Sequence, residues 1–348
     1  MATASPTKRP LREAFTDSLP VSLGLETAVM HRDEMRLHHH FLTAGRAFFP
    51  GQFDRRWFTE LPDQADQRAC LLHATLALSA THLGICTKGD EHPRAIFHRL
   101  ESLRLLRALS AAPARPLDSE SLLAACWALQ LQSMHLDDGL QESFVFTDLA
   151  THISSRIELS QHSLDYTSPH QYRSTTGIDR RIWSSAGASL QKSACLFVEE
   201  HMHCFYEHLL NTTIENTTSD IAGAAAYRKL TRRFGKLSRH NRNDVLFGKS
   251  LASRVVTTHF LAVSLLMSTV AFTEDADLQA CPLSSIPVWI KQICDEVGSC
   301  YGQALIVRWP LTVADASNAL MARGWVSISG YFAYISKHPD AFLLASTI

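Results

Sequence analysis

The hydrophobic pattern from residue 34 onward constrains the fold more strongly than any other feature of the sequence. Apolar side chains recur every three to four positions, as Leu37, Phe41 and Ala44 do, which places them on one face of a helix. The sequence lacks alternating Val and Ile runs between turn residues, which would indicate strands. It therefore predicts an all-α fold, with a flexible segment at residues 1–30 and one extended helical domain at residues 31–348.

Breaker and capping residues divide this pattern into separate helices. An apolar helix at residues 69–83 is expected to end at Gly84, and Asp118 or Ser119 is expected to cap a later one. In a helix at residues 93–111, the predicted buried stripe is Ile96, Leu100, Leu103 and Leu106. Residues 160–181 are expected to form a polar loop. Helices are also expected at about 143–157, 185–210, 221–236, 243–274, 287–307, 311–322 and 324–336.

The charge balance argues against nucleic-acid binding. The chain has 33 Lys and Arg against 34 Asp and Glu, a net charge of -1, and neither sign forms a long block. The first residues have no apolar core of a signal peptide. The longest apolar stretch, at residues 259–272, is shorter than the ~20 residues of a membrane span. We therefore expect a cytoplasmic protein with no membrane span and no direct contact with nucleic acid.

The cysteines exclude a zinc cluster from this sequence. Such a cluster needs closely spaced thiolates, and no C-x2-C pair is present. The eight cysteines are scattered, at Cys70, Cys86, Cys126, Cys195, Cys204, Cys281, Cys294 and Cys300.

Several short segments carry a resemblance to a known family. They are the LHHHF segment at residues 37–41, the LHATLALSATHL helix at 72–83, the LDDGL segment at 136–140 and the WPL segment at 309–311. Residues 34–150 and 303–325 resemble the ligand-sensing region of fungal sterol-uptake-type zinc-cluster regulators. This resemblance implies a helical domain with an internal apolar pocket for a terpenoid-like ligand.

In layout the chain resembles the fungal humulene synthases more closely, which look like regulator domains without the zinc cluster. This second resemblance implies a magnesium-dependent class I sesquiterpene cyclase of secondary metabolism, with farnesyl diphosphate as substrate and a humulene-type hydrocarbon as product. It also implies a diphosphate-binding lysine, for which Lys192, Lys249 and Lys291 are alternatives. The alternative function is a ligand-sensing regulator domain without its own DNA-binding module. A homodimer is one oligomeric state that the sequence leaves open.

The DDxxxE run at residues 137–142 is the first candidate metal site. Mg²⁺ prefers oxygen ligands and binds diphosphates through one or two carboxylates. On a helix Asp138 and Glu142 would be i,i+4 neighbours with Asp137 beside them, so all three are predicted metal ligands. The alternative is a solvated loop whose aspartate caps a helix.

A second candidate group is Glu199, His203 and Glu207, which a continuous helix would place on one face at i, i+4 and i+8. Three metal-competent side chains on one face suit a second metal position across a cavity. The alternative is an exposed charged face.

The remaining candidates concern the substrate. Lys291 or Arg308 would offer positive charge to the diphosphate, unless they are surface residues. Asp315 and Asn318 lie in a mostly apolar helix and face either a pocket or a neighbouring helix. Apolar and aromatic side chains would shape the hydrocarbon pocket and stabilise carbocations, although core packing explains the same residues. They are Trp127, Phe205, Met267, Trp289 and Trp309.

Overall fold

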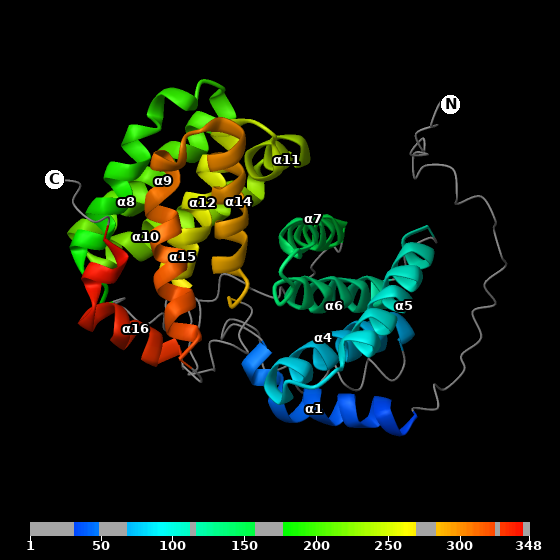
Figure 1. The fold of residues 1–348 in the computed structure, drawn as a ribbon. Helices are drawn as coiled ribbons and strands as arrows, with labels where there is room; N and C mark the ends of the chain where they lie inside the picture. The colour runs from blue at the N-terminus through cyan, green and yellow to red at the C-terminus, as the bar shows by residue number, and fades with distance from the viewer. Residues whose placement is uncertain are drawn as a thin grey trace, which may run out of the picture.

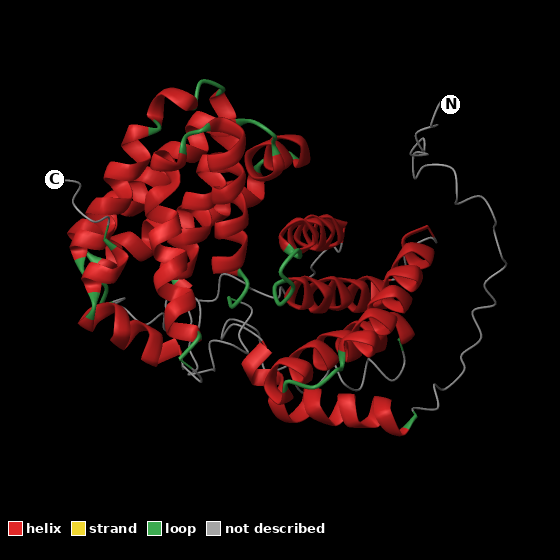
Figure 2. Cartoon of the chain, viewed as in Figure 1, coloured by secondary structure: helices red, strands yellow, loops and turns green. Residues whose placement is uncertain are grey.

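The computed structural model describes residues 31–48, 68–111, 116–156, 177–268, 283–323 and 328–343. Within these ranges all regular structure is helical and no strand occurs, as Figure 2 shows, which confirms the all-α prediction. The expected flexible segment at residues 1–30 and most of the predicted loop at 160–181 lie outside the described residues.

The helices gather in two groups (Figure 1). The first contains α1 (Arg32–Phe48), α4 (Ala69–Thr87), α5 (His92–Ala111), α6 (Pro116–Ser133) and α7 (Leu140–Arg156). The second contains α8 (Arg180–Lys192), α9 (Glu200–Thr218), α10 (Asp220–Lys236), α11 (Arg239–Phe247), α12 (Leu251–Leu266), α14 (Ile286–Tyr301), α15 (Arg308–Met321) and α16 (Ile328–Lys337). Short 3₁₀ helices lie at Ala194–Leu196, Ala304–Val307 and Pro339–Phe342.

Each group has its own hydrophobic core. In the first, α4 contacts α1, α5 and α6, and most of its side chains are buried. Among the described helices, α4 alone is long and apolar enough to cross a membrane, but 61% of its most apolar window is buried in the protein. A core helix has this same composition, so the feature is weak evidence for a membrane span. The second core includes residues from α8 to α16.

Several predicted boundaries are wrong for identifiable reasons. Helix α4 runs through Gly84 to Thr87, and the bare Cα of Gly84 faces Glu91 at the start of α5. The next helix begins at Pro116, before the predicted caps, since proline is favoured in a first helical turn. The helix predicted at residues 185–210 is two helices, α8 and α9, and the one predicted at 243–274 is divided between α11 and α12.

The buried face of α5 also differs from the predicted stripe. Ile96 and Leu100 are 43% and 58% exposed, whereas Leu106 is buried. Most buried positions nearer the start of α5 are polar: His98 contacts His73 at 2.9 Å and Ser102 donates to the carbonyl of Cys70 at 3.0 Å. Hydrogen bonds to α4 therefore decide which face of α5 is turned inward.

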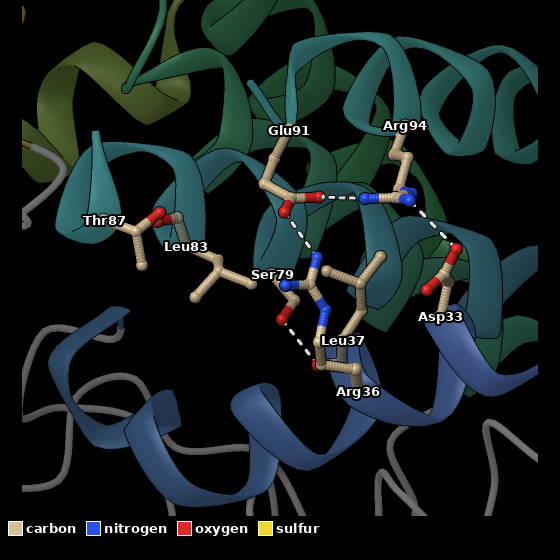
Figure 3. Close-up of polar contacts among 8 residues, drawn as sticks. All are labelled: Asp33, Arg36, Leu37, Ser79, Leu83, Thr87, Glu91 and Arg94. Atoms are coloured by element: carbon tan, nitrogen blue, oxygen red, sulfur yellow. Dashed lines mark hydrogen bonds and ion pairs between the residues drawn. The ribbon is translucent and has the colours of Figure 1, made fainter. Parts of the chain in front are cut away.

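A polar corner holds α1 against α4 and α5 (Figure 3). Glu91 lies between Arg36 of α1 and Arg94 of α5 and forms an ion pair with each. Arg94 also reaches Asp33 at 2.9 Å, and the hydroxyl of Ser79 donates to the carbonyl of Leu37 at 2.6 Å. Burial of Glu91 raises its pKa, but the two arginines outweigh this, so that the pKa lies below its usual value.

The two groups meet at the turn of residues 134–139 and at α7. The indole N–H of Trp289 on α14 donates to the carbonyl of Leu136 in the turn at 3.0 Å. Phe144 of α7 contacts the rings of Phe234 and Phe247, with centroids 5.7 Å apart in both cases. An ion pair at 2.9 Å joins Asp148 of α7 to Arg242 of α11. The α6–α7 connection is therefore the joint between the two cores.

The joint depends on the absence of a side chain at Gly139. A Cβ there would lie 1.8 Å from the carbonyl oxygen of Ser133. We expect Gly139→Ala to lower the free energy of unfolding by about 2 kcal/mol, because the turn must open to admit the methyl group. Urea denaturation measures this change. As a control, Gly235→Ala in α10 meets no atom within 4 Å and should stabilise by about 0.5 kcal/mol. Equal effects of the two substitutions would contradict this reading.

His259 is a core residue rather than a surface base. It is fully buried on α12, where Nδ1 donates to the carbonyl of Val255 at 2.8 Å and Nε2 accepts from Ser189 at 2.9 Å. Its ring stacks on Trp309 with centroids 5.9 Å apart. Burial lowers the pKa of His259 to about 4, partly offset by the bond to Val255.

Acid should therefore weaken the fold below neutral pH. Between pH 6.5 and about 4 the unfolded chain binds a proton at His259 that the folded chain does not, so stability falls as pH falls through this window. One such residue contributes at most about 1.4 kcal/mol per pH unit. His259→Gln should flatten the pH dependence of the free energy of unfolding, and exposed His240→Gln should not. An unchanged slope in the first variant would contradict the buried neutral state.

Candidate functional site

The acidic run at residues 137–142 is divided between a turn and a helix. Asp137 and Asp138 lie in the turn before α7, and Glu142 lies in the first turn of α7. The prediction that Asp138 and Glu142 share a helix face is therefore wrong, because the Gly139 turn precedes the helix. Both aspartates are exposed, and neither forms a hydrogen bond or ion pair with any residue that the structure describes.

Glu142 is engaged by a buried arginine. Its Oε2 forms an ion pair with the guanidinium of Arg99 on α5. The same guanidinium donates to Gln132 at 2.6 Å and to Ser133 at 3.0 Å at the end of α6, and it lies 5.4 Å from the ring centroid of Phe146. The side chain of Arg99 is only 10% exposed. Glu142 therefore contributes to a contact among α5, α6 and α7.

The electrostatics of this region follow from the burial of Arg99. Desolvation lowers the pKa of its guanidinium, while Glu142 and, at longer range, Asp138 raise it. Asp137 and Asp138 offer oxygen ligands beside this cation, and oxygen is the ligand that Mg²⁺ prefers. Their residue types fit such an ion, bound through one or two carboxylates and water. Glu142 would bind the same ion only through Oε1, or through Oε2 after breaking its ion pair with Arg99.

The second predicted group is rearranged by the break between α8 and α9. Glu199 precedes α9, so it does not lie on a helix face with His203 and Glu207. His203 pairs with Glu207 at 3.2 Å, whereas Glu199 approaches His201 at 3.6 Å. The structure thus brings together two of the three predicted residues and separates the third.

A different set forms around Glu199. His201 contacts Asp244 of α11 at 2.8 Å through the same Nε2 that faces Glu199. One ligand atom from each of these three residues lies within 4.8 Å of the others. Imidazole and carboxylate donors suit a divalent transition metal. The hydrogen bond between His201 and Asp244 also accounts for the arrangement without an ion.

The candidate diphosphate-binding residues are distributed over the surface. Lys291 of α14 forms an ion pair with Asp315 of α15 at 2.9 Å, and both side chains are about half exposed. This pair raises the pKa of Lys291. Arg308 and Asn318 are partly buried on α15. The negative charge of Asp315, which stands among apolar residues in the sequence, is thus compensated by Lys291 at the surface.

The residues predicted to line a hydrocarbon pocket fall into both cores. Phe205, Met267 and Trp309 are buried in the second core, where Phe205 contacts the rings of Phe234 and Phe260 at 5.6 and 5.5 Å. Trp127 packs against the first core instead. The structure therefore does not bring Trp127 together with the others. Core packing accounts for the contacts of the three buried residues.

Comparisons with known proteins found no relative of this chain. No protein-family model matches the chain, and no curated protein or solved structure matches it.

Sequence reasoning missed the residues that engage the candidates. Arg99 carried no signal by spacing, since it lies inside a segment whose apolar residues suggested another buried face. His201 lies at the start of α9, where the sequence predicted the middle of one continuous helix. Its partner Asp244 lies on α11. A search for arginines between apolar neighbours would have found Arg104 and Arg107 of the same helix before Arg99, which follows His98.

We expect Arg99→Met to lower the free energy of unfolding by about 3 kcal/mol, because it leaves Glu142, Gln132 and Ser133 without their donor. The control is Arg104→Met, whose exposed side chain pairs with Glu101 within one helix and should change stability by no more than about 0.5 kcal/mol. Urea denaturation of both variants makes the comparison. A loss of similar size in both would show that Arg99 does not lock the joint.

Proposed function

We propose that this chain is an atypical class I sesquiterpene cyclase that converts farnesyl diphosphate to a humulene-type hydrocarbon. The observation that carries the proposal is the pair of exposed carboxylates at Asp137 and Asp138. They lie side by side in a turn that is held at the joint of two helical cores, and they have no ion-pair partner among the described residues. A rigid turn with two uncommitted carboxylates is suited to a divalent cation.

In this proposal Asp137 and Asp138 would hold Mg²⁺, and the bound ion would supply the positive charge that a departing diphosphate needs. Glu142 keeps Arg99 in place, and Arg99 in turn fixes the end of α6 from which the acidic turn begins. The C–O bond of the substrate breaks with departure of diphosphate, an alkene closes the ring on the resulting allylic cation, and loss of a proton gives the neutral hydrocarbon. The role of the chain is to position the substrate and exclude water.

A specific observation favours a second function. Phe205, Met267 and Trp309 are packed in the core, and Glu142 is bound to Arg99, as expected if the region serves stability alone. A ligand-sensing or partner-binding domain of the regulator type, without its own DNA-binding module, needs no metal at the turn. In that case the acidic turn is a structural joint.

Incubation of the purified full chain with farnesyl diphosphate and Mg²⁺ tests the first function, with the headspace examined for hydrocarbon by mass spectrometry. We expect a sesquiterpene that disappears in EDTA. Asp138→Asn should reduce its rate of formation on the order of 100-fold, because a ligand of the leaving-group ion is lost. Asp90→Asn, at an exposed aspartate in the loop after α4, should leave the rate unchanged.

Two outcomes would overturn parts of the proposal. If folded protein gives no hydrocarbon from geranyl, farnesyl or geranylgeranyl diphosphate, the proposal of a cyclase is wrong and that of a regulator-type domain is favoured. If hydrocarbon forms and Asp138→Asn is as active as the parent chain, the assignment of the metal to the acidic turn is wrong.

A further inference from the structure

The near-neutral net charge of the chain conceals a strongly basic helix. From residue 221 to residue 243 the sequence contains no Asp or Glu, while Lys and Arg recur from Arg228 onward. They include Arg228, Lys229, Arg232, Arg233, Arg239 and Arg242. Most of this segment is α10, whose opposite face is apolar and packs on α9 through buried residues such as Leu230 and Phe234. The helix therefore presents a cationic face to solvent.

Four of these cations surround a hollow. A depression of about 410 Å³ is lined by Ala225, Arg228, Lys229, Arg232 and Arg233. Lys229, Arg232 and Arg233 are exposed, and within the described part of the chain they have no ion-pair partner. In contrast, Arg242 and Arg239 face Asp148 at the joint between the cores. The uncompensated positive charge is thus concentrated at the hollow.

Helix stability does not explain this arrangement. Arg228 and Arg232, and likewise Lys229 and Arg233, are i,i+4 pairs of like charge, each of which destabilises a helix by roughly 0.2–0.5 kcal/mol. Cations favour the last turn of a helix through the macrodipole, which accounts for Arg233 but not for Arg228 and Lys229 further from the helix end. The field also extends to α9: burial, followed by Lys229 and Arg233, lowers the pKa of His208, against a smaller opposing effect of Glu207.

We propose that the α10 hollow binds a small phosphate-bearing anion of the diphosphate class. Guanidinium groups bind phosphate oxygens in pairs, and the ammonium of Lys229 adds a point charge. Ala225 also lines the hollow and adds no charge to it. The cations are confined to one small hollow on a chain of net charge -1, which favours a compact ligand over duplex DNA or a membrane surface. This site is separate from the acidic turn and does not depend on the proposed cyclisation.

Isothermal titration of the full chain with inorganic pyrophosphate tests this site. EDTA is present, so that no metal bridges the ligand to Asp137 or Asp138. We expect saturable binding that weakens as NaCl is added. The variant K229Q/R232Q/R233Q should lose affinity by about ten-fold or more, because the donors are gone. Its fold should be retained, since the three side chains are exposed and form no ion pair with a described residue.

The matched control removes three exposed cations elsewhere, at Arg32, Lys88 and Lys337, and should bind as the parent chain does. Equal losses in both variants, or no binding by the parent chain, would overturn the site. A second arm measures cosedimentation with phosphatidylserine vesicles and binding to duplex DNA. If either binds in a manner that depends on Lys229, Arg232 and Arg233 while pyrophosphate does not, the small-anion proposal is wrong. Because no turnover is measured, these outcomes are independent of the cyclase assay.

Discussion

The arrangement of the first core and of the α6–α7 joint depends on the hydrogen bonds and ion pair of one buried guanidinium, that of Arg99. A cation removed from water must be paired and hydrogen-bonded. Arg99 meets this requirement only where the end of α6 and the start of α7 both approach α5. Gln132 extends the network to Thr81 of α4 at 3.1 Å. The α6–α7 turn is consequently held in one place, and α14 makes its contact there through Trp289.

This arrangement gives the acidic run two different roles. Glu142 stabilises the positive charge of Arg99, whereas the adjacent aspartates are exposed and form no ion pair with the side chains that the structure describes. A residue whose carboxylate compensates a buried cation is poorly placed to give up that contact for a metal, since the unpaired guanidinium would be left behind. Any metal at the joint would therefore rely first on the turn, and the helix would contribute rigidity. The same reasoning applies to either proposed function, because a fixed turn serves recognition as well as catalysis.

Charge in this protein is organised locally rather than globally. The acidic turn and the basic face of α10 lie on different elements, and the totals nearly cancel in the net charge of -1. The near-equal totals argue against nucleic-acid binding, but they do not reveal the four cations that line the hollow on α10. The relevant quantity is the charge within a Debye length, ~8 Å at physiological salt. At that scale the hollow on α10 is strongly cationic while the chain as a whole is almost neutral.

By itself the sequence determined the all-α class and most helix positions, because a period of three to four residues is a local property that each segment carries independently. It also singled out the acidic run at residues 137–142, although it predicted that Asp138 and Glu142 share a helix face. Only the tertiary structure decided which carboxylates are engaged: the partner of Glu142 lies 43 residues away on another helix. The tertiary structure also places His201, and not the predicted His203, beside Glu199. It pairs Lys291 with Asp315. Contacts between helices join residues that are far apart in the sequence, so no local pattern reveals them. Hydrophobic periodicity predicts the buried face of a helix only when that face does not also carry polar side chains that bond to other helices.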